Sequence, residues 1–278
     1  AIYLFLVKNE LHFYYKGMEE LIRIHSSYFS MYLAFSVLLI GLHTYHHWNS
    51  TRWFNIILRI LLCTFFTFFM YVLAARTVFF VLILMMIGLS FYYFYKNKKL
   101  ILGIFLAVFI CISAYYLLSL KNFYLRFYYV FHPKSWEWKG LETKNEWLIK
   151  KVLWGCNLEA ILSSNWLMGA GTGDSWQSVM PCYKRWNFQG YEKKYNAHNQ
   201  YLETWLRMGI IGLATLMTGF WIPLWKSLKR KYLYYAVFLT LFMFSILTES
   251  MLDRQFHRAL TALRNRRTKV TRRVTSKK

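Results

Sequence analysis

An all-α, polytopic membrane protein with one large loop domain is the fold that this sequence predicts, and three observations support it. Of the 278 residues, 57% are hydrophobic and only 17% are charged, which is a membrane composition. The apolar residues gather in windows of about 20 residues, the length that an α-helix needs to cross a bilayer. One long stretch between these windows, residues 121–203, is rich in charged residues and tryptophan instead.

Six windows have the length and composition of membrane-spanning helices. They lie at about 28–45, 53–73, 77–95, 100–120, 204–225 and 232–250. We therefore expect about four spans within residues 1–120 and two more within 204–250. The chain starts with Ala1 and shows no cleavable signal peptide, so we expect it to be the C-terminal part of a longer protein that is truncated at its N-terminus.

The orientation of the loop follows from two basic connectors between spans. One connector holds Lys96, Lys98 and Lys99, and the other is the basic run 226–231. Lys and Arg are enriched in cytoplasmic connectors, and two spans separate these two, so both are expected on the cytoplasmic side. The sequence thus predicts that 121–203 is a periplasmic loop of a multi-pass protein in the bacterial inner membrane, and that the connection around Arg76 is also periplasmic.

The end of the chain departs from this pattern. Residues 251–278 hold ten Lys or Arg and a single acidic residue, Asp253, so this tail supplies nine of the net +23 charges. One interpretation is a disordered basic tail that is attracted to acidic lipid or glycan. The other, which we favour, is an aberrant end in which the last helix has been lost by truncation or a frame error. In either case the basic charge does not indicate nucleic-acid binding.

A polar segment precedes the fifth apolar window in "NAHNQYLETWLRMGIIG", residues 196–212. If a helix begins near His198, then Trp205, Gly209 and Gly212 share a face with it at 100° per residue. The two glycines would let another helix approach closely beneath the histidine. Taken alone, His198 is equally well explained as an interfacial histidine that marks the helix end.

The spacing of this segment resembles the signature of the bacterial O-antigen ligase family. His198 and Asn199 are followed by nine residues, Gly209, two residues and Gly212. In addition, "LMGAGTGDSW" (167–176) resembles the glycine-rich segment upstream of the family histidine, and "HSSYFSMYLAF" (25–35) resembles a helix start in the family. The resemblance covers roughly residues 20–250, which would be the C-terminal half of such a protein.

This resemblance implies a glycosyltransferase that uses no metal and no cofactor. Such an enzyme moves a glycan from undecaprenyl diphosphate to an acceptor hydroxyl, such as a lipid A core sugar, and His198 would be its catalytic base. A polysaccharide polymerase of the same superfamily, which differs in its acceptor, is the alternative function. A polysaccharide or lipid transporter is a second alternative. The expected partners are the lipid-linked donor, the glycan acceptor and the membrane, and not nucleic acid.

Two basic residues are assigned to the diphosphate through the resemblance. Arg76 corresponds to a family arginine that contacts the lipid-linked diphosphate, and its planar fork suits that group; alternatively, Arg76 lies in a hairpin turn and reaches outward. A second family arginine precedes a tryptophan, and the matching place here is Lys150, before Trp154. Because lysine replaces the family arginine here, Arg126 or Arg185 could contact the diphosphate instead. Arg59, close to the cytoplasmic end of its span, is expected to be structural.

The glycine-rich segment does not resemble a nucleotide-binding loop, because no Lys-Ser or Lys-Thr follows it. We expect a turn whose backbone approaches the substrate or the loop helices, and we assign Gly171, Gly173 and Asn199 to substrate binding. Asp174 is expected to cap a helix. Cys156 and Cys182 lack metal-ligand spacing and could pair if the loop faces an oxidising space, whereas Cys63 and Cys111 lie within spans.

Overall fold

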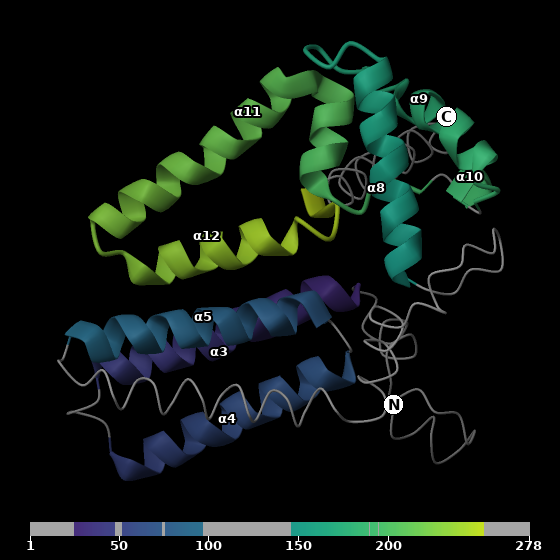
Figure 1. Ribbon diagram of the computed structural model, residues 1–278. Coiled ribbons are helices and arrows are strands. Elements are labelled where there is room, and N and C mark those ends of the chain that lie inside the picture. The colour runs from purple at the N-terminus through teal and green to yellow at the C-terminus, as the bar shows by residue number, and fades with distance from the viewer. Residues whose placement is uncertain are drawn as a thin grey trace, which may run out of the picture. The chain divides into compact units, whose positions relative to one another are not determined.

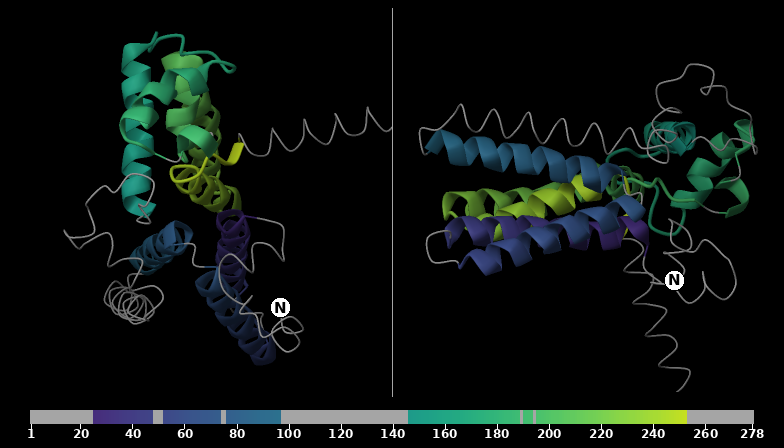
Figure 2. Two further views of the ribbon diagram at one scale, coloured as in Figure 1. Left: turned by 90° about the vertical axis from the view of Figure 1, so that its right-hand side faces the viewer. Right: turned by 90° about the horizontal axis from the view of Figure 1, so that it is seen from below.

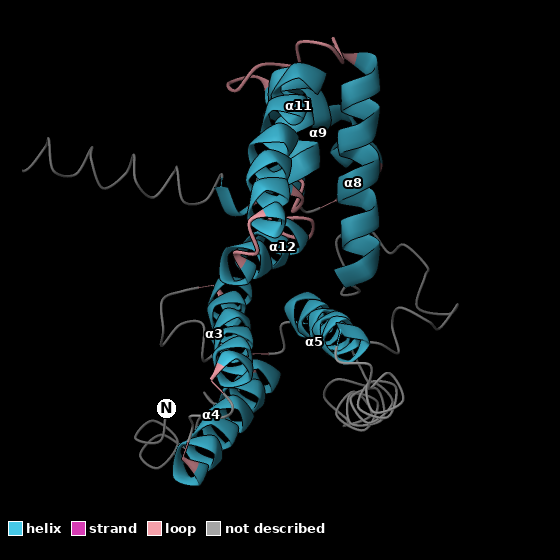
Figure 3. Cartoon of the chain, turned by 90° about the vertical axis from the view of Figure 1, so that its left-hand side faces the viewer, coloured by secondary structure: helices cyan, strands magenta, loops and turns pink. Residues whose placement is uncertain are grey.

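The computed structural model describes residues 25–47, 52–73, 76–96, 146–188, 190–193 and 195–252. These residues form helices joined by turns, with no strand among them (Figure 3). The prediction of an all-α chain is therefore confirmed for the part of the chain that the structure describes.

The helices follow one another along the chain as labelled in Figure 1. Their bounds are α3 (Ser26–His46), α4 (Trp53–Val72), α5 (Arg76–Lys96), α8 (Glu146–Ser163), α9 (Ser175–Arg185), α10 (Gly190–Lys193), α11 (Gln200–Lys229) and α12 (Leu233–Ser245). Within the described ranges, α3, α4, α5 and α11 are long and apolar enough to cross a membrane. The predicted spans 28–45, 53–73 and 77–95 thus coincide with α3, α4 and α5, while the predicted span 100–120 and the basic tail from residue 253 lie outside the described residues.

The sixth predicted span, 232–250, is wrong at its C-terminal end. Helix α12 has 13 residues and stops at Ser245, and residues 246–248 form a turn. The carbonyl of Ile246, which would accept from residue 250 in a continuing helix, accepts instead from the backbone N–H of Gln200 at 2.9 Å. The apolar run continues through Ile246 and Leu247, so hydropathy alone could not locate this end.

The chain divides into two compact units. The first comprises Ala1–Lys139, Thr143–Leu148 and Met217–Ser245, and the second comprises Gly140–Glu142, Ile149–Leu216 and Ile246–Lys278. This division cuts α11 into an N-terminal part in the second unit and a C-terminal part in the first. The predicted domain boundaries near residues 120, 203 and 250 were drawn on membrane topology and stay a prediction.

In the first unit, α3 contacts α4, α5 and α12 (Figure 2). Edge-to-face contacts join Phe29 to Phe69 of α4, and Phe35 to Phe238 of α12. Helix α3 begins at Ser26, and the Nδ1 atom of His25 accepts from the N–H of Ser27 at 3.4 Å, which confirms the predicted helix start in 25–35. The C-terminal part of α11 packs against α12 through a small apolar cluster of Leu224, Ala236 and Leu239.

Helix α4 exposes most of its apolar side chains. Trp53, Phe54, Leu61 and Phe68 are each more than half exposed, although the helix is almost entirely hydrophobic. A soluble protein rarely presents so large an apolar surface to water, whereas lipid tails accept it without cost. The exposure of α4 therefore fits a helix that faces lipid.

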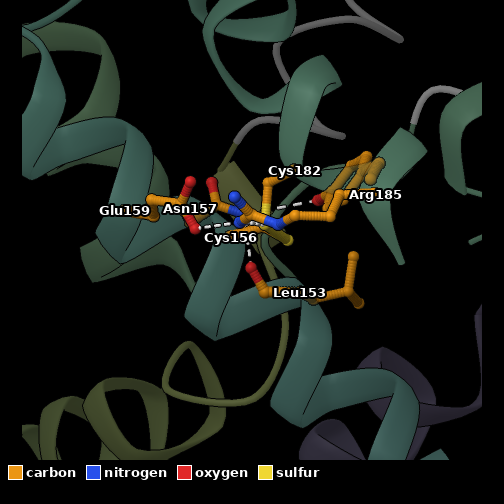
Figure 4. Close-up of a disulfide and its surroundings, with 7 residues drawn as sticks. Leu153, Cys156, Asn157, Glu159, Cys182 and Arg185 are labelled. Carbon is orange, nitrogen blue, oxygen red and sulfur yellow. Dashed lines mark hydrogen bonds and ion pairs between the residues drawn. A yellow bond between two sulfur atoms is a disulfide. The ribbon is translucent and has the colours of Figure 1, made fainter.

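In the second unit, a disulfide between Cys156 and Cys182 joins α8 to α9 (Figure 4). Beside it, the Nδ2 atom of Asn157 donates to the hydroxyl of Tyr183 at 3.3 Å and to the carbonyl of Leu153 at 2.7 Å. Tyr183 is completely buried, and burial raises the pKa of its hydroxyl. The pairing that the sequence left open is thus present, and it gives the second unit a covalently linked core. Cys63 is a free thiol, and Cys111 lies outside the described residues.

Candidate active site

Helix α11 begins one residue after Asn199, which caps it. The Oδ1 atom of Asn199 accepts from the backbone N–H groups of Tyr201 at 3.0 Å and of Leu202 at 3.2 Å. Asparagine is among the preferred residues for this role because its side chain satisfies N–H groups that have no partner within the helix. His198 therefore lies outside the helix, with a left-handed φ of 45°. The helix begins near His198, as expected, but two residues after it.

Glu203 holds the segment that carries His198 against the first turn of α11. Its Oε2 atom accepts from the backbone N–H of Ala197 at 2.8 Å, and its Oε1 atom lies 2.6 Å from Nη2 of Arg207. The Glu203 side chain is only 5% exposed, so both contacts are largely shielded from water. A buried carboxylate with a guanidinium partner and a backbone donor fixes the geometry of the chain that it binds.

Gln200 ties the turn after α12 to the start of α11. Besides the bond from its backbone N–H to Ile246, its side-chain Oε1 accepts from the N–H of Leu252 at 3.0 Å. Its Nε2 donates to Oγ1 of Thr204 at 3.3 Å. These bonds at both ends of 246–252 bring Glu249, 51 positions along the chain from His198, to the histidine.

The His198 ring is held between a carboxylate and an aromatic ring. Its Nδ1 atom lies 3.3 Å from Oε2 of Glu249, and the two side chains are 22% and 11% exposed. Tyr195 meets the imidazole edge-to-face at 6.0 Å between centroids, and Phe188 and Tyr183 continue this row of rings into the core beside the disulfide. An ionised carboxylate only accepts hydrogen bonds, so this contact favours a proton on Nδ1 and leaves Nε2 as the basic nitrogen.

Lys150 of α8 reaches the same turn. Its Nζ atom donates to the carbonyl of Thr248 at 3.2 Å, and Thr248 immediately precedes Glu249. The lysine is partly buried. An amine and an imidazole thus contact successive residues of the chain, Thr248 and Glu249.

The glycine-rich segment lies at a kink in α11. Gly209 has φ 65° and ψ −169°, and α11 consists of two helical parts that meet there (Figure 1). The backbone N–H groups of Ala170 and Gly171 donate to the carbonyls of Leu206 and Arg207 at 2.7 and 3.1 Å. The expected helix-to-helix notch at Gly209 is therefore wrong, because the turn around residue 167 fills that space.

The expected face shared by His198, Trp205, Gly209 and Gly212 is also absent, since the helix starts after His198 and breaks at Gly209. Trp205 instead donates from Nε1 to the carbonyl of Trp166 at 3.2 Å. The first part of α11 also separates Asn199 from the kink. Ten residues of helix at 1.5 Å each place Gly209 about 15 Å from Asn199.

Two of the residues that the sequence assigns to the site contact neighbouring residues of one segment: Lys150 contacts Thr248, and His198 contacts Glu249. Asn199 follows His198 and caps α11. Gly171 and Gly173 lie on an exposed turn near the kink, at the other end of the first part of α11. Asp174 occupies the residue before α9, where its carbonyl, not its carboxylate, receives N–H groups of the first turn.

Three arginines were also considered for the diphosphate. Arg76 is the first residue of α5, in the first unit. Arg185 is exposed and forms an ion pair with Glu159 on α8 (Figure 4), and Arg126 lies outside the described residues. Lys150 donates to the residue before Glu249, the partner of His198, and is the candidate that we retain for the second basic role.

Sequence reasoning did not identify Glu249, Glu203 or Arg207 as parts of the site. The signal was available, because carboxylates in windows long enough to span a membrane are costly and tend to mark function. Glu249 falls within the predicted span 232–250, and Glu203 is the residue directly before the predicted span 204–225. No group of three or more His, Cys, Asp or Glu that could hold a metal ion occurs among the described residues.

The apolar helices α3, α4, α5 and α11 define a multi-pass membrane protein, and the site at the start of α11 combines an imidazole, a carboxylate and an amine. A family model described as O-antigen ligase matches residues 60–217, more than half of the chain. The chain belongs to this family, and it is a bacterial membrane enzyme of the O-antigen ligase and polymerase type. No curated protein and no solved structure matches it.

Proposed function

We propose that this protein is an O-antigen ligase that transfers a glycan from undecaprenyl diphosphate to a hydroxyl of the lipid A core. The reaction takes place on the periplasmic side of the inner membrane and uses neither a metal nor a cofactor. The Cys156–Cys182 disulfide supports this location, since such bonds persist in the periplasm and are rare in the cytosol.

The contact between His198 and Glu249 is the observation that carries the proposal. With the proton of the ring on Nδ1, Nε2 accepts the proton of the acceptor hydroxyl as its oxygen attacks the anomeric carbon. The bond from that carbon to the diphosphate oxygen breaks, and the electron pair leaves with undecaprenyl diphosphate. Glu249 then stabilises the imidazolium, as a carboxylate partner does in other histidine-based sites.

The leaving diphosphate requires positive charge. Lys150 supplies it as a point charge beside the histidine, and Arg76 supplies the forked contact. Gly171 and Gly173 contribute an exposed turn whose backbone meets the glycan. Asn199, which caps α11 directly after His198, is the further residue that we assign to substrate binding. A polymerase would use the same residues with a lipid-linked repeat as the acceptor.

The test is the surface glycan of a strain that carries only the His198→Ala variant. We expect transfer to fall by about 10²- to 10⁴-fold, the usual contribution of a positioned general base, with the protein still present in the membrane. A ligase defect leaves full-length glycan on undecaprenyl diphosphate and bare lipid A core at the surface. His47→Ala, at an exposed position after α3, is the matched control.

The products separate the alternatives. Cores that carry a single repeat would show a polymerase, and lipid-linked material stranded on the cytoplasmic face would show a transporter. A normal glycan profile from His198→Ala would remove the histidine from the mechanism.

A further inference from the structure

Arg59 is the one charged residue of α4, a helix that is otherwise mostly apolar. It is the seventh residue of α4, so it lies about 9 Å along the helix from Trp53 at 1.5 Å per residue. Its Nη1 atom donates to Oγ1 of Thr44 on α3 at 3.2 Å. A guanidinium has five N–H donors, and this bond uses one of them.

Arg59 lines an open and mostly apolar pocket, called the cavity below, between three helices of the first unit. The cavity has a volume of about 310 Å³ and is lined by Leu39, Ile40 and His43 of α3, Arg59 of α4 and Tyr234 of α12. Leu39 and Ile40 give it an apolar wall, whereas Arg59, His43 and Tyr234 supply hydrogen-bond donors. Such a lining suits a molecule with an anionic head and an apolar body.

The surrounding helices offer Arg59 no carboxylate. The described parts of α3, α4, α5 and α12, and of α11 from Met217 onward, contain no Asp or Glu. Lys226 and Lys229 of α11 add positive charge, and Arg52 lies just before α4. An arginine at membrane depth normally pairs with an acidic group or backbone carbonyls because its charge is costly to bury.

We infer that this cavity binds the phosphate of an anionic glycerophospholipid, with Arg59 as the main ligand and His43 and Tyr234 as polar neighbours. The lipid supplies the negative charge that the helices lack, and its acyl chains lie along the exposed apolar surface of α4. Leu39–His43, Arg59 and Tyr234 all lie toward the predicted cytoplasmic ends of their helices. Basic pockets at that level of a membrane bind anionic lipid head groups.

The test measures lipid binding to the purified full-length chain by native mass spectrometry in detergent. Phosphatidylglycerol and phosphatidylethanolamine with identical acyl chains are compared, and glycerol phosphate serves as a soluble source of the same head group. We expect the wild type to retain phosphatidylglycerol in preference. Arg59→Gln should lower that affinity about tenfold, the loss expected for one charged hydrogen bond, and leave phosphatidylethanolamine binding unchanged.

Arg52→Gln is the matched control. It removes the same charge from an exposed position just before α4 that does not line the cavity. Arg59→Lys, which keeps the charge, should show a preference for phosphatidylglycerol between those of the wild type and Arg59→Gln. If Arg59→Gln fails to fold, the wild type and Arg59→Lys together test the proposal. Equal binding of the two lipids by the wild type would overturn the proposal. So would a preference that survives in Arg59→Gln, or competition by glycerol phosphate as strong as that by the lipid.

Discussion

Gly209 lies directly against the backbone of Leu167. A Cβ atom added to Gly209 would be 2.1 Å from the carbonyl oxygen of Leu167 and 2.6 Å from the backbone nitrogen of Met168. The backbone of Gly209 is also in a region that only glycine occupies readily. The kink of α11 and the glycine-rich turn therefore depend on each other, because a side chain at position 209 would keep the two backbones apart.

Gly209→Ala should destabilise the protein markedly. Strained backbone alone costs about 1–3 kcal/mol, and the clash with Leu167 adds to it. Gly219→Ala, in the same helix, should be neutral or stabilise by up to about 1 kcal/mol, because alanine is the better helix former and nothing lies within 4 Å of the added Cβ. Melting temperatures of the two purified variants check this, and equal values would show that the kink is not built as described.

The disulfide predicts the side of the membrane on which the second unit lies. With Cys63 and Cys111 replaced by serine, the remaining pair should resist maleimide labelling in unfolded protein from intact cells until a reductant is added. Removing it through Cys156→Ser should lower stability by about 2–4 kcal/mol, the usual contribution of such a link. Labelling of both thiols without reductant would contradict the pairing and remove its support for a periplasmic loop.

A direct measurement of orientation uses two exposed positions in the same background, which lacks Cys63 and Cys111 and keeps the Cys156–Cys182 disulfide. Thr172→Cys, in the glycine-rich turn, should react with a membrane-impermeant reagent in spheroplasts, and Arg230→Cys, between α11 and α12, should react only after the membrane is opened. The reverse pattern would invert the topology drawn from the lysine-rich connectors.

Glu249→Gln should lower glycan transfer without unfolding the site. The amide keeps the shape of the side chain but no longer stabilises an imidazolium on His198, so we expect a loss of about tenfold or more, smaller than that from His198→Ala. Glu159→Gln is the control, because it removes an exposed carboxylate of the same unit that pairs with Arg185. Activity of Glu249→Gln equal to that of the control would exclude Glu249 from the mechanism.

Lys150→Met should reduce transfer by about tenfold or more, as expected when a charged hydrogen-bond donor is lost. Lys150→Arg should restore most of the activity, since the family pattern has arginine at the corresponding place. Lys151→Met changes the neighbouring exposed lysine and should behave as the wild type. These rates are compared as product formed per amount of protein in isolated membranes. A defect shared by Lys150→Met and Lys151→Met would indicate a general effect of charge on the loop.

Composition and periodicity were sufficient to predict the helical membrane architecture. Crossing a bilayer requires long uninterrupted apolar helices, so α3, α4 and α5 can be read directly from the residues that form them. The spacing from His198 to Gly212 was likewise sufficient to indicate the family, which the match over 60–217 shows. The apolar helices and the spacing of the motif each depend on residues that are close together in the sequence, so the sequence alone is sufficient to predict them.

The site itself depended on tertiary structure. The break at Gly209 follows from the turn that packs on it, and the end of α12 at Ser245 follows from the bond between Gln200 and Ile246. Glu249 reaches His198 only because both ends of its segment are tied to the start of α11. Contacts between residues about 50 positions apart leave no periodicity in the chain, so only the folded structure could reveal which carboxylate orients the histidine.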